Sequence, residues 1–121
     1  MSLSATGFDD ALDYKIIHET ASTNSLNTNV ATTEGKLFSV KLVNGSSSAA
    51  YLKVFNSESP TLGSTLPILV LPVAGSGTIY YTIPNGVDFE TLSFACTLNQ
   101  NPTDTTAPSG NTVAVTFVCG G

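Results

Sequence analysis

The 121-residue sequence contains no tryptophan, one histidine and few charged side chains, which make up 11 % of the chain. Its four basic residues are all lysines, so arginine is absent. Nucleic acids and anionic membrane surfaces are bound by clusters of cationic side chains. A chain with four lysines and a formal net charge of −5 offers no such cluster. We therefore expect neither nucleic acid nor a membrane among its partners.

Side chains that carry catalysis or hold metal ions are also scarce. His18 has no second histidine or cysteine near it in the sequence, so we expect it on the face of a strand. Asp9, Asp10 and Asp13 lack the glycine and later glutamate of a calcium loop, which favours a solvated terminus. Serine is abundant, but no Gly-x-Ser-x-Gly elbow accompanies it. The sequence predicts no enzyme, no catalytic residue, no metal site and no cofactor.

Cysteine is too scarce for a disulfide scaffold, because the chain has only two. Cys96 falls on the apolar face of a predicted strand, and Cys119 lies close to the C-terminal end. We expect two unpaired thiols packed as small hydrophobic groups. A disulfide between them is the alternative, and it requires the two strands that carry them to be neighbours.

No apolar run is long enough to span a membrane. The longest, residues 66–74, is interrupted by Pro67 and Pro72. Both faces of this segment are apolar, which is typical of a covered strand, but proline cannot donate to a sheet ladder and favours edge strands or strand ends. An exposed edge strand with two apolar faces would invite association. We therefore predict that an interface covers this strand.

The chain does contain a series of short segments in which apolar and polar residues alternate, each closed by glycine, proline, asparagine or serine. Residues 91–98 show the pattern most plainly, and we expect one face of this strand to be core and the other to meet water. The expected core face carries Leu92, Phe94, Cys96 and Leu98. The number and spacing of such segments predict an all-β, antiparallel β-sandwich, Greek-key or jelly-roll-like, with seven to eight strands.

The first 35 residues differ from the rest. Residues 12–19 alternate well enough to form a strand, but residues 20–35 are almost wholly polar and read as an exposed arm or long loop. Long structureless loops in compact domains are usually binding segments or disordered ones, and both alternatives stay open. The sequence therefore predicts an N-terminal arm over residues 1–35, with one possible strand, and a β-sandwich domain over residues 36–121.

Five short motifs follow one another after residue 50: YLKVFN, SESPTLGSTLP, LPILVLPVAGSGT, IPNGVDFETLSFACT and DTTAPSGN. Small β-sandwich proteins of tailed bacteriophages carry a YLKLYN strand, a PTVGTDTP loop, a PNG turn followed by an aromatic residue, and a late DTT loop in the same order. Over residues 37–118 the chain resembles these structural proteins, which include capsid decoration (cement) proteins and modules of fibres or other appendages.

The resemblance implies a non-enzymatic virion component on the capsid surface, foremost a decoration protein that binds the major capsid protein or another virion protein and stabilises the shell. It also implies a homotrimer. Many repeated modest contacts would supply the strength, and a surface rich in serine, threonine and asparagine suits them. We expect the partner interface to include apolar residues of the arm, the apolar edge strand and one tyrosine: Leu26, Val30, Leu66, Leu69, Leu71 and Tyr80.

The alternative function is a fibre or appendage module that recognises a glycan on the host surface. Adjacent strand residues point to opposite faces, so one ring of the pair Tyr80 and Tyr81 is expected in the core and the other on the surface. An exposed tyrosine can bind sugar. The absence of tryptophan and arginine weakens this reading.

Overall fold

The computed structural model describes residues 14–110 and 112–120, and the regular secondary structure in these ranges consists of β-strands. The seven strands are β1 (Tyr14–Ser22), β2 (Gly35–Asn44), β3 (Ala50–Asn56), β4 (Leu69–Val73), β5 (Thr78–Phe89), β6 (Leu92–Thr97) and β7 (Val113–Gly120). Every pairing between them is antiparallel. Within the described residues no helix has the length and apolar character needed to cross a membrane. The predicted all-β antiparallel sandwich is confirmed.

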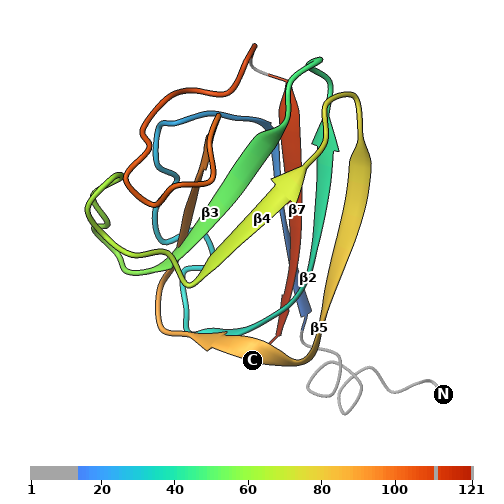
Figure 1. Cartoon of the computed structure of the whole chain (residues 1–121). Coiled ribbons are helices and arrows are strands. Elements are labelled where there is room, and N and C mark those ends of the chain that lie inside the picture. Colours follow the sequence, from blue (N-terminus) through green and yellow to red (C-terminus); the bar gives the residue numbers. More distant parts are fainter. Residues whose placement is uncertain (1–13, 111, 121) are drawn as a thin grey trace, which may run out of the picture.

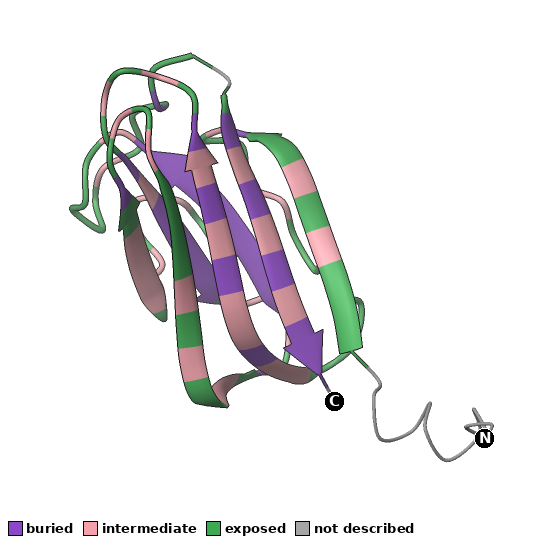
Figure 2. Ribbon diagram, turned by 90° about the vertical axis from the view of Figure 1, so that its right-hand side faces the viewer, coloured by how far each residue is buried: buried purple, intermediate pink, exposed green. Residues whose placement is uncertain are grey.

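The strands form two sheets that face each other (Figure 1). One sheet has the order β1-β7-β2-β5 and the other has the order β4-β3-β6. Along β2 and β7, buried residues alternate with half-buried ones, as expected for strands with one face on the core (Figure 2). The edge strands β1 and β5 are more exposed.

The core lies between the two sheets. Phe94 of β6 and Phe117 of β7 meet there edge to face, with ring centroids 5.0 Å apart. Aromatic pairs of this geometry stabilise a core beyond the area that they bury. Further core residues come from the inward faces of both sheets and include Leu37, Val40, Leu42, Leu52, Val54, Leu92, Val113 and Val115.

Strand β6 is buried on both faces, which corrects the expectation that one face meets water. Ser93, Ala95 and Thr97 are as inaccessible as the core residues between them. Their outward face is covered by loops, since the Ser93 hydroxyl donates to Ser57 O at 2.6 Å and the Thr97 hydroxyl donates to Asn99 O at 2.8 Å. The alternation predicted the strand and its inward face, but not the cover on the outer face.

Lys53 of β3 lies under the same cover and is fully buried. Its ammonium group donates to the backbone oxygens of Asn101 and Asp104 in the loop after β6. Desolvation lowers the pKa of Lys53, and attraction by Asp104 partly opposes that shift. The buried charge is thus satisfied by loop carbonyls, which ties this loop to the outer face of the three-stranded sheet.

The described part of the predicted arm is packed on the sandwich. Residues 14–22 form β1, which pairs with β7 and matches the predicted strand over the part of residues 12–19 that the structure describes. The polar segment that follows lies along the free side of β6, where Asn27 and Phe94 exchange two backbone hydrogen bonds of 2.9 Å. Ala31 is buried in the core. Many side chains of this segment are exposed, so it is a long loop held along β6. The arm over residues 1–35 and the domain boundary at residue 35 stay predictions.

Backbone pairing explains why so polar a segment packs there. In addition to the Asn27 bridge, Val30 N donates to Leu92 O and Cys96 N donates to Thr23 O, both at 2.8 Å. Main-chain groups make these bonds, so they need no apolar side-chain pattern.

The two cysteines are unpaired, as predicted, and both are buried. Cys96 lies on β6 and Cys119 on β7, which belong to different sheets. Desolvation raises the pKa of each thiol from 9.0 to about 11, and attraction by Lys15 partly opposes the shift for Cys119.

We expect these thiols to make the free energy of unfolding fall as the pH rises from 9 to about 11. The folded state favours the protonated thiol, so this contribution is complete below the unfolded pKa and is lost as the pH approaches the folded pKa. The loss is on the order of 2 kcal/mol for each thiol. Urea unfolding across this range measures it. The double variant Cys96→Ala/Cys119→Ala is the control, and an equal fall in the variant would assign the effect to other groups.

Candidate functional site

The side chains considered for catalysis or metal binding do not form a site among the described residues. His18 lies on the outer face of the four-stranded sheet, where its Nδ1 atom is 2.8 Å from the Thr116 hydroxyl. Within residues 14–110 and 112–120, no group of three or more histidine, cysteine, aspartate or glutamate side chains is placed to hold a metal ion. The acidic cluster of Asp9, Asp10 and Asp13 lies outside the described residues.

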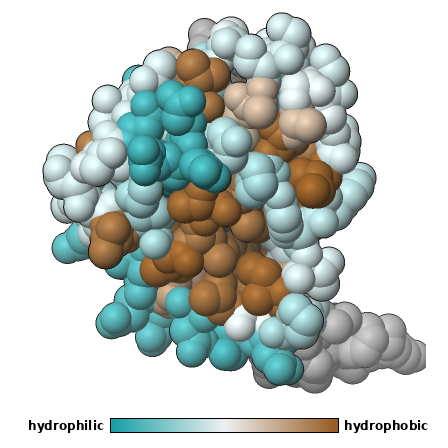
Figure 3. Space-filling view, in the orientation of Figure 1, coloured by the Kyte–Doolittle hydropathy of each residue, from teal (hydrophilic) through white to brown (hydrophobic). Residues whose placement is uncertain are grey.

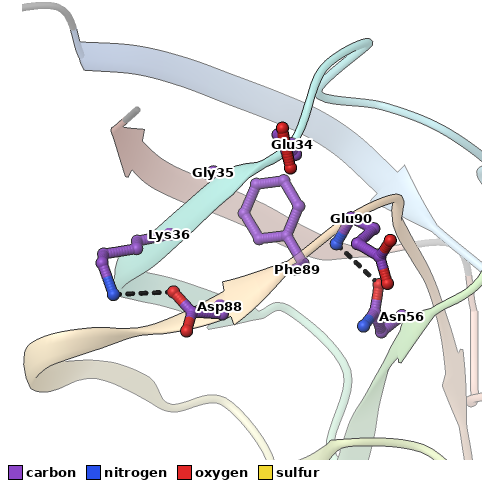
Figure 4. A pocket seen from close by; sticks show the side chains of 7 residues that line it. All are labelled: Glu34, Gly35, Lys36, Asn56, Asp88, Phe89 and Glu90. Atoms are coloured by element: carbon purple, nitrogen blue, oxygen red, sulfur yellow. Dashed lines mark hydrogen bonds and ion pairs between the residues drawn. The ribbon is translucent and has the colours of Figure 1, made fainter.

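A hollow of about 560 Å³ opens at one end of the sandwich, beside the start of β2 and the end of β5 (Figure 4). Lys36 and Asp88 face each other across these paired strands at 2.6 Å. The side-chain oxygen of Asn56 accepts hydrogen bonds from the backbone nitrogens of Glu90 and Thr91. These contacts fix the turn from β5 to β6. We assign this hollow a structural role.

An apolar surface lies where β4 and β5 border the core. These two strands are edges of different sheets on the same side of the molecule (Figure 1). They are close at the 74–77 turn, where the Tyr81 hydroxyl donates to Pro72 O, and they diverge toward the start of β4. The core is therefore incompletely covered between them. Figure 3 shows hydrophobic surface gathered in this region.

We call this surface the β4–β5 flank and define it by Leu66, Ile68, Leu69, Leu71 and Ile83. Leu69, Leu71 and Ile83 pack on the core but stay half-exposed. Leu66 and Ile68, which precede β4, have exposed fractions of 76 % and 38 %. Exposed apolar side chains gathered near one edge strand are typical of a protein interface.

The flank is bordered by two free sheet edges. Within the described residues, β4 pairs only with β3, and β5 pairs only with β2. The edge position predicted from the prolines is thus confirmed for β4, although the strand begins at Leu69 rather than Leu66. Free edges present unpaired backbone groups to a partner, so the flank combines apolar side chains with hydrogen-bonding backbone.

Three of the six residues predicted for the partner interface lie on β4 or shortly before it. Leu66, Leu69 and Leu71 belong to the flank. Tyr80 lies on the outer face of β5, 68 % exposed, with the Lys41 ammonium 5.5 Å from its ring centroid.

The other two residues lie next to β6, at the edge of the three-stranded sheet opposite to β4. Leu26 and Val30 flank the Asn27 bridge to β6, and Val30 packs against the core. Strand β3 separates β6 from β4, so these two residues and the flank do not form one continuous surface.

Sequence reasoning missed a second, polar surface. Two adjoining hollows on the outer side of the three-stranded sheet share Tyr51, Gln100 and Asn101. The run Asn-Gln-Asn at positions 99–101 was the visible signal, but the chain pattern does not indicate that it lies beside Tyr51.

Comparisons with protein-family models, with curated proteins and with solved structures gave no significant match.

Proposed function

We propose that this protein is a capsid decoration protein of a tailed bacteriophage, which binds the major capsid protein or another virion protein and stabilises the shell. The phage-like motifs between residues 37 and 118 support this proposal. The observation that carries it is the β4–β5 flank, an apolar surface beside two free sheet edges. Such a surface suits attachment to other chains and requires no catalytic group.

We further propose that the protein is a homotrimer that uses the flank between its subunits or toward the shell. An exposed β-strand edge next to half-covered core side chains would otherwise promote uncontrolled association. Repetition of the contact over a shell multiplies a modest affinity through avidity. We propose that the protein is located on the capsid surface and that it binds neither nucleic acid nor a membrane.

The double substitution Leu66→Asp/Ile68→Asp should convert the oligomer to monomers if the flank lies between subunits. If the flank faces the shell, the substitution should weaken co-sedimentation with undecorated capsids at least tenfold, roughly 1.4 kcal/mol. Both side chains precede β4 and are exposed, so folding should be retained. Light scattering and sedimentation measure the two effects.

Ile16→Asp is the matched control, because Ile16 is 70 % exposed but lies on β1, in the other sheet. It should leave both measurements unchanged. If Ile16→Asp dissociates the oligomer and the flank variant does not, the interface lies on the outer face of the four-stranded sheet. Unchanged assembly and capsid binding in both variants would contradict the role of the flank.

The second candidate function, a glycan-recognising module of a fibre or appendage, is favoured by the hollows around Tyr51. The number of copies in purified particles distinguishes the decoration protein from the appendage module. A copy number comparable to that of the shell subunits supports decoration, and one comparable to that of tail fibres supports the appendage.

A further inference from the structure

The polar surface around Tyr51 has the composition of a small-molecule site. One hollow, of about 550 Å³, is lined by Tyr51 and the loop residues Asn99, Gln100 and Asn101, together with Ser48. The adjoining hollow, of about 380 Å³, extends it past Tyr51 to Pro72 and Pro102. In Figure 3, hydrophilic surface gathers in the region that the loop after β6 occupies in Figure 1.

The loop that carries Gln100 and Asn101 is fixed by hydrogen bonds to Lys53 of β3 and by hydrogen bonds within the loop. Lys53 donates to two of its carbonyl oxygens. The Asp104 carboxylate accepts from Asn99 N at 3.1 Å and from the Thr106 hydroxyl at 2.8 Å. Burial alone would raise the pKa of Asp104, but the hydrogen bonds from Thr106 and Asn99 outweigh it and leave the pKa below its ordinary value. A loop that is already ordered loses little entropy on binding.

Every residue that lines the two hollows is neutral. Lys53 is buried beneath the loop and is not one of them. Tyr51 is half-exposed, and Gln100 and Asn101 are exposed. The side-chain amides of these two residues make no hydrogen bond among the described residues, so they are free to bind a ligand. A flat aromatic ring beside unengaged amide donors and acceptors matches a pyranose, which has an apolar C–H face and a rim of hydroxyl groups.

We propose that Tyr51, Gln100 and Asn101 form a binding site for a neutral carbohydrate, with the sugar ring against Tyr51 and its hydroxyl groups on the two amides. This proposal goes beyond shell attachment, because the site and the flank use different residues. It also differs from sugar binding at the Tyr80–Tyr81 pair. The Tyr81 hydroxyl is already bonded to Pro72 O, and neither tyrosine lines these hollows.

The test is a titration of the ¹⁵N-labelled protein with glucose, galactose and N-acetylglucosamine, and with glucuronic acid as an anionic counterpart. At least one neutral sugar should shift the backbone signals of Tyr51 and of residues 98–101, with saturation in the millimolar range, which is about −4 kcal/mol. Glucuronic acid should bind at least threefold more weakly, because the site offers no cation.

Tyr51→Ala and Gln100→Ala should each weaken binding at least fivefold, and Tyr80→Ala should have no effect. Gln100 is exposed on a loop, so its variant keeps the test valid if Tyr51→Ala does not fold. The proposal is overturned if no neutral sugar shifts these signals, if the shifts map to Tyr80, or if Gln100→Ala binds like the unmodified protein. Shifts of the same signals by a virion protein, but not by sugars, would assign the surface to protein contact instead.

Discussion

Replacing Phe94 with alanine is expected to lower the free energy of unfolding by about 3 to 5 kcal/mol, the usual range for removal of a core aromatic side chain. Phe94 has an exposed fraction of 1 % and stacks edge to face on Phe117. Both faces of β6 are covered, so the cavity left by the ring is not open to solvent. The side chain also links the two sheets, since Phe117 belongs to the other one.

Chemical denaturation monitored by circular dichroism measures this loss. Tyr80→Ala is the control, because Tyr80 is 68 % exposed, and surface changes of this kind usually stay within about 0.5 kcal/mol. A Phe94→Ala protein that unfolds at the denaturant concentration of the unmodified chain would contradict the inward orientation of this side chain.

Much of the sandwich could be predicted from the sequence because strand alternation is a local property. The inward residues of β6 could be predicted from the alternation of neighbouring residues alone. Proline gave a further reliable signal. Pro72 lies near the end of β4, which is an edge strand, and a missing backbone donor is tolerated in such a position.

The cover on the outer face of the three-stranded sheet could not be predicted in this way. Ser93 and Thr97 are polar and alternate with apolar residues, which is the pattern of a solvated face. Ser57, in a loop distant in sequence, accepts the hydrogen bond of the Ser93 hydroxyl, and the loop that follows β6 accepts that of Thr97. Lys53 is the clearest case, because a lysine is rarely fully buried and its partners in the loop are about 50 positions away.

The two candidate surfaces also differ in whether they are built from one stretch of sequence or from distant segments. Leu66, Leu69 and Leu71 are close in sequence, so one apolar segment with prolines was enough to predict them together. The Tyr51 site depends on a strand and a loop that meet only in the folded chain. Leu26 and Val30 were assigned to the interface by their place in a polar segment, but they lie on the other side of the sheet because that segment pairs with β6.

Deletion of residues 1–35 is expected to abolish cooperative folding. The deletion removes β1, which pairs with β7 from Tyr14 to Ser22, and so exposes the edge of a core strand. It also removes the segment that is bonded to β6 and the buried side chain of Ala31. In the truncated chain, core side chains beside β6 and β7 would be exposed and both sheets would have new free edges. Both changes favour aggregation over folding.

Thermal unfolding and light scattering of the truncated chain test this expectation, and a paired substitution in the full chain separates it from effects of truncation itself. Ala31→Asp places a carboxylate in the core and should destabilise the fold by about 3 kcal/mol or more. Thr33→Asp, two positions further on, introduces the same charge at an exposed residue and should change stability by about 0.5 kcal/mol or less. A truncated protein that unfolds cooperatively with undiminished stability, together with equal effects of the two substitutions, would show that residues 14–35 are dispensable for the fold and would return them to the role of a separate binding arm.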